Sequence, residues 1–215
     1  MSKAKRLVFP VVAVGSTLAG AAMLLARFYL YVPFATAGTS MLPAIPPGQT
    51  LFVDRTRAAP ERGKVVVFTA VEAQGKELVY RVVGVAGDVV EVKGGKLSVG
   101  GAPVPRCELG RAKTDAEGAP RDVVAAVEKL GAQTYVVYTH PGIAMPDGRW
   151  EVKPGEVFVM GDNRDVAFDS RAFGGGKGAG VPAAAIVGAV RGADAPPSPE
   201  SIPAELRPAL AACKL

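Results

Sequence analysis

The most informative stretch of this chain is GDNRDVAFDSRAFG, residues 161–174. It follows Glu156–Met160, a short run rich in Val and Phe whose length and composition are typical of a buried β-strand. The stretch itself carries too many Asp and Arg side chains for an apolar core, and Asp and Asn suit turn geometry. It therefore predicts a polar loop at the end of a strand, either solvated with internal ion pairs or part of a functional site.

Most of the chain beyond residue 27 consists of short apolar runs separated by Gly, Pro and charged residues, which predicts a mainly β fold. The run Val89–Val99 is typical of a β-hairpin. Only Arg121–Leu130 has helical spacing, and we interpret 102–133 as a small inserted region. Residues 192–215 form a Pro-rich tail, with a short helix expected within 204–215. The predicted strands are Thr50–Val53, Lys64–Thr69, Leu78–Val85, Val89–Val92, Lys96–Val99, Thr134–Thr139 and Glu156–Met160.

An uncharged apolar run of 20 residues, Leu7–Ala26, stands near the start of the sequence. As a helix it would be roughly 30 Å long, the thickness of a bilayer core. Three basic residues precede it and Arg27 follows it, so the positive-inside bias places residues 1–6 in the cytoplasm. We expect a single-pass anchor in the inner (plasma) membrane at 7–26, with the lipid bilayer as a partner and the folded part on the outer, periplasmic or extracellular, side.

Two alternatives to an anchor concern the same run. A buried soluble helix rarely extends this far without a charge. A cleavable signal peptide is the stronger alternative, because Ala35-Thr36-Ala37 has the small-x-small pattern of a cleavage site. Against it, the run exceeds the roughly 7–15 residues of a signal-peptide core, and Arg27–Tyr31 intervenes. A cleaved signal peptide would leave an ordinary exported β-domain beginning near Gly38.

Charge and cysteine content narrow the classes of function. The net charge is +5, but residues 1–27 supply four of the 25 basic groups and no acids, which leaves 21 against 20, or +1, for the rest. The folded part therefore lacks the basic surface of a nucleic-acid-binding protein. Cys107 and Cys213 are the only cysteines, and the sequence leaves open whether they pair or stay as thiols. With His140 as the only histidine, we expect no metal site and no cofactor.

Two further stretches carry residues suited to chemistry. The first is PFATAGTSMLP, residues 33–43, directly after the apolar run. Here Gly38 gives the backbone freedom to approach a substrate, and backbone N–H groups beside Ser40 are placed to hold a developing oxyanion. A serine in such a turn, taken alone, is more often structural. The second is YRVVGVAGD, residues 80–88, a strand followed by a tight turn.

Together and in this order, the three stretches resemble the type I signal peptidase family, whose members are membrane serine proteases with a Ser/Lys dyad. In that family an S-M-x-P element carries the nucleophile, a K-R-x-x-G-x-P-G-D element carries the general base, and a G-D-N-R-D-N-S-x-D-S-R element braces the site. The resemblance extends from the anchor to about Arg191. It rests on Ser40-Met41-Leu42-Pro43, on Arg81, Gly84, Gly87 and Asp88, on Gly161–Asp165, and on Asp169-Ser170-Arg171.

The resemblance implies an antiparallel β catalytic unit, formed by 27–101 and 134–191, on the outer face of the membrane. It also implies that the partners are signal-peptide-bearing preproteins, cleaved after small residues that fit shallow apolar pockets. By carry-over Ser40 is the nucleophile, its own N–H is an oxyanion donor, and Asp169 and Arg171 form an ion pair near the site. The residues expected to shape the oxyanion site and its loop are Gly38, Asp162, Asp169, Ser170 and Arg171.

The sequence departs from the family where the general base belongs. Tyr80 stands in place of the lysine, and Ala167 replaces the serine that orients that lysine; Val166 and Ala86 replace an Asn and a Pro. Burial lowers the pKa of a lysine, which makes it a free base, but raises the pKa of a tyrosine, which keeps it an acid. Tyr80 is therefore a poor replacement as a base, although it retains a hydrogen-bond donor.

No other residue replaces the lysine convincingly. His140 is a base by type but lies far along the chain, near a Pro-Gly turn. Lys64 opens a predicted strand, and its reach to Ser40 is not given by the sequence. Lys76 precedes Tyr80 by four residues, about 13 Å along a strand.

Two hypotheses of function follow, and both centre on Ser40. The leading one is a signal-peptidase-like membrane serine endopeptidase that cleaves exported preproteins, with Ser40 and the Tyr80 position as its catalytic pair. The alternative is a catalytically inactive relative that binds exported segments or a membrane partner without cleaving them. The retained Ser40 favours chemistry, whereas Tyr80 and Ala167 favour binding alone.

Overall fold

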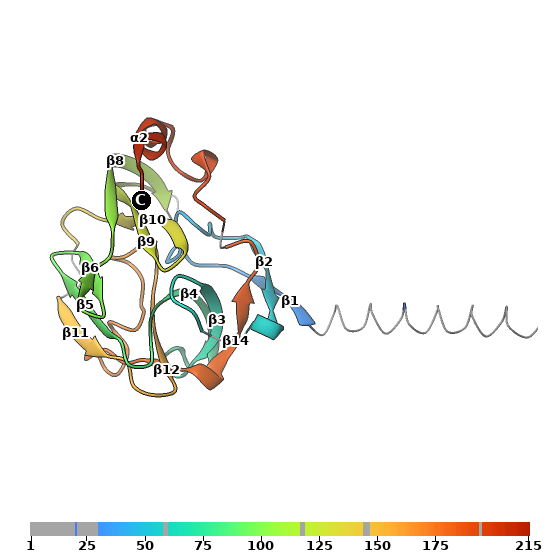
Figure 1. Cartoon of the computed structure of the whole chain (residues 1–215). Coiled ribbons are helices and arrows are strands. Elements are labelled where there is room, and N and C mark those ends of the chain that lie inside the picture. Colours follow the sequence, from blue (N-terminus) through green and yellow to red (C-terminus); the bar gives the residue numbers. More distant parts are fainter. Residues whose placement is uncertain (1–19, 21–29, 58–59, 117–118, 144–146, 194) are drawn as a thin grey trace, which may run out of the picture.

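The computed structural model describes Gly20 and residues 30–57, 60–116, 119–143, 147–193 and 195–215, which form a mainly β fold of antiparallel sheets (Figure 1). Each strand predicted from the sequence is present, with bounds that differ by one or two residues at an end. The strands are β1 (Tyr31–Ala35), β2 (Thr50–Asp54), β3 (Val65–Ala70), β4 (Lys76–Val85), β5 (Val89–Lys93), β6 (Lys96–Val99), β7 (Ala102–Pro103), β8 (Arg106–Ala116), β9 (Ala119–Leu130), β10 (Gln133–Thr139), β11 (Gly148–Glu151), β12 (Glu156–Met160), β13 (Val181–Pro182) and β14 (Ile186–Val190).

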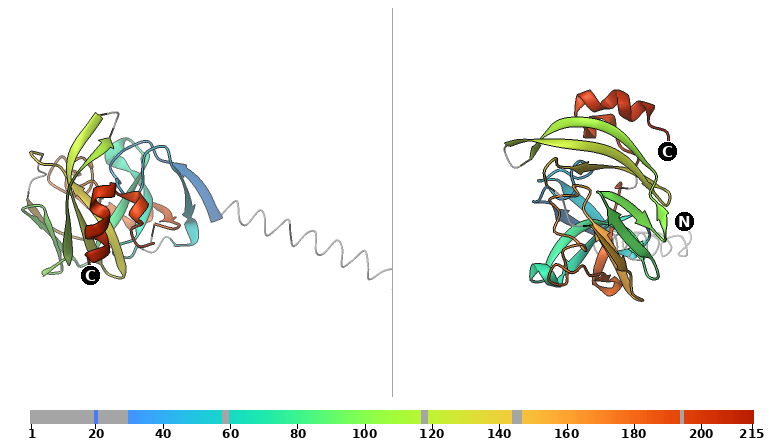
Figure 2. Two further views of the ribbon diagram at one scale, coloured as in Figure 1. Left: turned by 90° about the horizontal axis from the view of Figure 1, so that it is seen from above. Right: turned by 90° about the vertical axis from the view of Figure 1, so that its left-hand side faces the viewer.

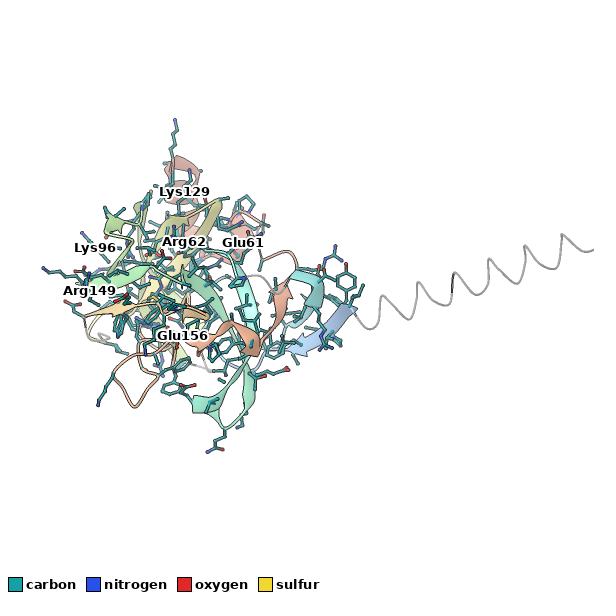
Figure 3. All side chains as sticks on the ribbon, turned by 60° about the horizontal axis from the view of Figure 1, so that its bottom comes forward. Glu61, Arg62, Lys96, Lys129, Arg149 and Glu156 are labelled. Carbon is teal, nitrogen blue, oxygen red and sulfur yellow. The ribbon has the colours of Figure 1, made fainter. Side chains whose placement is uncertain are left out.

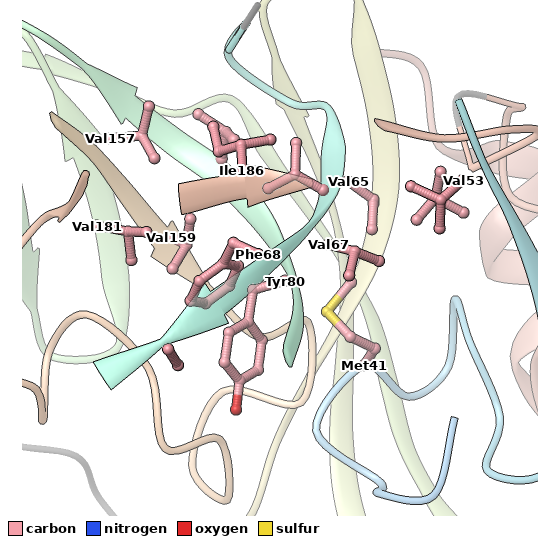
Figure 4. Close-up of a cluster of buried hydrophobic side chains, with 14 of the residues drawn as sticks. Met41, Val53, Val65, Val67, Phe68, Tyr80, Val157, Val159, Val181 and Ile186 are labelled. Carbon is pink, nitrogen blue, oxygen red and sulfur yellow. The ribbon is translucent and has the colours of Figure 1, made fainter. Parts of the chain in front are cut away.

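The largest sheet has seven strands in the order β1-β2-β14-β3-β4-β12-β13. Inside it, β4 lies between β3 and β12, with Tyr80 opposite Val66 and Arg81 opposite Met160. Successive side chains on a strand point to opposite faces. The ring of Tyr80 accordingly packs into one apolar cluster beside Phe68, as Figure 4 shows, while Arg81 lies on the other face.

A separate three-stranded sheet, in the order β10-β9-β8, contains most of the region predicted as an insertion. The helical interpretation of Arg121–Leu130 is wrong, because this segment lies in β9 and pairs with β8 and β10. The reason is that β9 is covered on both faces: Val123 and Val127 join one apolar cluster, and Ala126 joins another. A strand buried on both sides loses the alternation that marks a half-exposed strand.

The predicted hairpin is confirmed by β5 and β6, which pair with Val90 opposite Val99. Its turn is Gly94-Gly95, with φ angles of 55° and 72°. Two successive positive φ values suit the two-residue hairpin turns that glycine favours. The hairpin belongs to a four-stranded sheet, β11-β5-β6-β7. This sheet packs against the other two in an apolar cluster that includes Phe158 of β12 and Val137 of β10.

The C-terminal segment packs on the three-stranded sheet, as two views in Figure 2 show. It contains 3-10 helices at Pro199–Ser201 and Ala204–Leu206, followed by α2 (Arg207–Ala212), so the short helix expected within 204–215 is confirmed. Ile202 and Leu206 are buried in an apolar cluster with residues of β8, β9 and β10. Other 3-10 helices lie at Arg55–Arg57, Val71–Ala73 and Ala183–Ala185.

Charged side chains divide into an exposed set and a buried set. Lys96 and Arg149 project from the surface in Figure 3. By contrast, Arg81, Arg164 and Arg171 are at most 3% exposed, and each is paired with a carboxylate. Burial of a charge is tolerated only with such a partner, and these pairs surround the site described below.

The described part of the chain has no helix of sufficient length and apolar character to cross a bilayer. The span predicted at Leu7–Ala26 lies outside the described residues, apart from Gly20. The described strands begin with β1, whose Tyr31 lies opposite Asp54 of β2.

Candidate active site

Ser40 lies in the turn that follows β1, and the loop of residues 161–174 holds its backbone in place. The carbonyl oxygen of Ser40 accepts a hydrogen bond from the backbone N–H of Asn163 at 3.0 Å. The side-chain amide of Asn163 donates to the carbonyl of Thr39 at 3.1 Å. Met41, the next residue, is 1% exposed and anchors the turn in the core of the large sheet. The serine is therefore fixed from both sides.

Tyr80 lies beside Ser40 in the lining of one groove, close enough for a hydrogen bond between the two side chains. Its ring is buried in the core of the large sheet, and Figure 4 shows the hydroxyl group at the edge of that cluster. Burial raises the pKa of Tyr80 to about 12, the hydrogen bond with Ser40 acts in the opposite direction, and the charge of Asp169 raises the pKa further. At neutral pH Tyr80 is a phenol, which donates or accepts a hydrogen bond but does not accept a proton.

A groove of about 190 Å³ opens beside Ser40 and Tyr80. Residues from the end of β1 and from the turn form one wall, and residues of β4 form the other. Most of the residues that line the groove have apolar side chains. The lining residues are Phe34, Ala35, Thr36, Ala37, Gly38, Ser40, Met41, Ile45, Glu77, Leu78, Val79 and Tyr80.

The segment Ala35-Thr36-Ala37, considered above as a cleavage site, thus forms part of this wall. Thr36 is 6% exposed, its hydroxyl donates to the carbonyl of Pro46 at 2.9 Å, and its N–H donates to the carbonyl of Gln49. In the folded protein these bonds hold the segment in place as a structural element of the groove.

Gly161 brings Ala167 next to Ser40 and Tyr80. A Cβ atom on Gly161 would lie 2.4 Å from the Cβ of Ala167, 2.6 Å from the carbonyl oxygen of Ser40 and 3.4 Å from the ring of Tyr80. Only glycine fits at such distances. Ala167, at the position of the family's orienting serine, therefore lies close to Tyr80 but offers it no hydroxyl group.

The ion pair expected between Asp169 and Arg171 is present, with two hydrogen bonds of 2.9 and 2.8 Å. Asp169 also accepts a hydrogen bond from the N–H of Gly161 at 2.9 Å. The hydroxyl oxygen of Ser170 accepts one from the N–H of Val159 in β12 at 3.0 Å. These residues tie the loop to β12 and hold it against Ser40 and Tyr80, which is a bracing arrangement.

Asp162 lies on the opposite face of β4 from Tyr80, where it forms a two-point ion pair with Arg81 at 2.8 and 2.6 Å. Arg81 donates in addition to the carbonyl of Gly63 at 2.7 Å and lies 4.0 Å from the ring centre of Tyr135. Both charged side chains are at most 2% exposed. The pair stabilises the strand and loop that carry the site without facing the groove.

His140 holds the serine turn indirectly. Its Nε2 lies 2.7 Å from the side-chain oxygen of Asn163, whose amide nitrogen already donates to Thr39. Nε2 is therefore the donor in this contact. The backbone N–H of His140 donates to Asp165 at 2.6 Å. His140, considered from the sequence as a base, thus supports the serine turn through Asn163. The sequence did not predict this contact because the residues involved are far apart along the chain.

Sequence analysis also missed Glu128. It is 1% exposed and binds Arg164 at 2.5 Å, Arg106 at 3.0 Å and the hydroxyl of Tyr135 at 3.3 Å. Arg164 in turn donates to the carbonyl of Gly161 at 3.1 Å. A buried network therefore links the three-stranded sheet to the site. The available signal was a single Glu inside the apolar run of β9.

The buried carboxylates near the site bind arginines rather than one another. Asp162, Asp169 and Glu128 each bind a guanidinium group. Within the described ranges, no group of three or more His, Cys, Asp or Glu side chains is arranged to hold a metal ion. The groove itself contains the hydroxyl of Ser40, the phenol of Tyr80 and the carboxylate of Glu77.

Alkaline pH is expected to destabilise the folded protein through Tyr80 by about 2–3 kcal/mol. The protonated form is favoured in the folded state, since its pKa is about 12 there and 10.0 in the unfolded chain. This contribution is therefore complete below pH 10 and is lost as the pH rises to about 12. Urea unfolding between pH 9 and 12 measures it.

Tyr80→Phe is the control, because it keeps the ring and removes the titrating group. The variant should lose about 2–3 kcal/mol less than wild type over this range. Tyr138, whose pKa burial also raises to about 12, contributes equally to both proteins. Equal alkaline losses in the two proteins would contradict the assignment.

Comparisons with known proteins each match signal peptidases. The family model described as "Signal peptidase, peptidase S26" matches residues 10–193. Signal peptidase I of Pseudomonas fluorescens is 33% identical over 167 residues, which cover 69% of this chain and 57% of that protein. Signal peptidase I T of Bacillus subtilis (strain 168) is 31% identical over 151 residues, or 69% and 67%. A crystal structure of a signal peptidase I from Enterococcus faecalis V583 aligns at 21% identity with a TM-score of 0.35, covering 61% of this chain and 96% of that one.

Proposed function

Because this chain belongs to the signal peptidase family, peptidase S26, we propose that it binds signal-peptide segments of exported preproteins in the groove beside Ser40, and that Tyr80 prevents their cleavage at neutral pH. The chain spans 57% of the Pseudomonas relative and 67% of the Bacillus one. The substrate class comes from the family. The absence of cleavage at neutral pH is inferred from Tyr80, which is a poor base.

One observation carries the proposal: Ser40 lies beside a buried tyrosine whose pKa is raised to about 12. At pH 7 about one Tyr80 side chain in 10⁵ is ionised. The base that should remove the proton of Ser40 is thus almost entirely in its acid form. The groove, the serine turn and the bracing loop are all in place, which supports the binding of a peptide.

A second candidate function, a slow serine endopeptidase, is favoured by the same contact. The small phenolate population of Tyr80 lies beside Ser40 and is a strong base. The backbone N–H of Ser40 then serves as the oxyanion donor, as in the family. In this case the cleavage rate rises about tenfold for each pH unit until the pH approaches 12 or the protein unfolds.

Membrane attachment is part of the proposal and rests on sequence. Leu7–Ala26 has the length and composition of a single span, and its basic flank favours a cytoplasmic N-terminal side. The groove then lies on the outer side of the inner (plasma) membrane, where signal peptides emerge.

Filling the groove is expected to weaken peptide binding. The protein, purified in detergent, is titrated with a fluorescent peptide that contains an Ala-x-Ala segment, and Leu78→Trp should weaken its binding by about tenfold or more, because the indole occupies the groove. Val71→Trp is the matched control: Val71 is 81% exposed and does not line the groove. Equal binding by the two variants, or none by wild type, contradicts the proposal.

Removal of the Ser40 hydroxyl distinguishes peptide binding alone from slow cleavage. Ser40→Ala should bind the peptide as wild type does. If wild type cleaves a preprotein slowly and Ser40→Ala does not, the slow endopeptidase is correct. If wild type and Ser40→Ala are equally inert between pH 7 and pH 10 while both bind the peptide, the protein acts by binding alone.

A further inference from the structure

The two cysteines of the chain, far apart in sequence, meet in the structure. Cys107 lies on β8, and Cys213 directly follows α2. The two thiols are free, lie at the edge of one apolar cluster and are close enough to interact with each other. Figure 2 shows α2 lying along the sheet that contains β8. We propose that Cys107 and Cys213 form a disulfide that fastens the C-terminal segment to the three-stranded sheet.

The segment that this bond would hold lies behind the serine turn. Ile202 and Leu206 are buried in the same cluster as Leu42, which stands two residues after Ser40. A small cavity beside them is lined by Pro43 and Ala44 of the turn and by residues of the C-terminal segment from Gly192 to Ser201. The segment thus forms a strap across the back of the turn, and Cys213 is near its end.

The end of the strap, beyond Leu206, is held weakly without the bond. The helix α2 has six residues and buries none of its side chains completely. Helices this short have little stability in water apart from their packing. A disulfide removes conformational freedom from the unfolded chain, and more so when the closed loop is long. A bond between β8 and the end of α2 closes roughly 100 residues, near the upper end of this effect.

Formation of the bond requires an oxidant, and a disulfide such as oxidised glutathione supplies it. One cysteine thiolate attacks a glutathione sulfur and releases the first glutathione thiol. The second cysteine loses its proton, attacks the mixed disulfide and releases the second. Two protein thiols are oxidised to one disulfide, and one oxidised glutathione is reduced to two thiols. Burial and the neighbouring Cys107 raise the pKa of the Cys213 thiol, so the exchange is faster at alkaline pH.

The first test uses the full chain with no substitution. It is incubated with oxidised and reduced glutathione, blocked with iodoacetamide and digested with trypsin, which does not cut Arg207-Pro208. The proposal expects residues 107–111 to be recovered joined to 192–214. Recovery of both peptides as carbamidomethyl or glutathione adducts, or of disulfide-linked dimers of the chain, would overturn the proposal.

The second test measures what the bond does. Oxidised wild type should melt about 5–10 °C above the reduced protein. Cys107→Ser, Cys213→Ser and the double variant should show no such difference between the two conditions. A linked pair of peptides without a rise in Tm would overturn the role as a fastener. Neither test depends on peptide binding or cleavage, so failure here is separate from failure of the proposed function.

Discussion

Tyr80→Lys combined with Ala167→Ser is expected to raise the rate of preprotein cleavage at neutral pH by about 10²–10⁴-fold, the usual contribution of a positioned general base. The burial that raises the pKa of Tyr80 would lower that of a lysine in the same place, so that more of it is the free amine. Arg171 acts in the same direction, while Asp169 opposes it. The new hydroxyl at residue 167 lies beside the new amine.

Three comparisons make this experiment decisive. Tyr80→Phe, which keeps the ring without adding a base, should give no acceleration. Tyr80→Lys alone should give less than the double variant, because nothing at residue 167 then orients the amine. Adding Ser40→Ala to the double variant should abolish the new activity. If the double variant folds and binds the peptide as wild type does but cleaves no faster, the geometry of the site is not that of a dormant peptidase.

Asp162→Asn is expected to reduce the free energy of unfolding by about 3–5 kcal/mol, because it leaves Arg81 as a buried charge without its partner. The two side chains form two hydrogen bonds, and neither is more than 2% exposed. Urea denaturation of the purified protein measures the loss. Since the same loop carries Gly161 beside Ser40, peptide binding should weaken in parallel.

The control is Glu61→Gln, the same change at an exposed carboxylate near the surface arginine Arg62 (Figure 3). It should change stability by no more than about 0.5 kcal/mol. Replacement of both partners, Arg81→Met with Asp162→Leu, should recover part of the loss, because no charge is then left buried. A loss below about 1 kcal/mol for Asp162→Asn would show that the pair is not the main support of the loop.

Half of the strands and one part of the site were predictable from local pattern. Alternating apolar runs and glycine turns located β2 to β6, β10 and β12, because side-chain alternation is a property of neighbouring residues. Asp169 and Arg171 are two residues apart, so their ion pair also needed no tertiary information. The helix predicted at Arg121–Leu130 was wrong for the opposite reason: partners from two other segments bury both faces of β9.

The sequence by itself determined the family, the serine, and the tyrosine that stands where a lysine belongs. Only the tertiary structure decided what surrounds them. The packing of β4 against the serine turn places Tyr80 beside Ser40 and raises the pKa of Tyr80. In the same way, distant segments bring His140 to Asn163 and Cys107 to Cys213. Burial and electrostatic environment depend on which segments meet in space, and residue spacing along the chain does not contain that information.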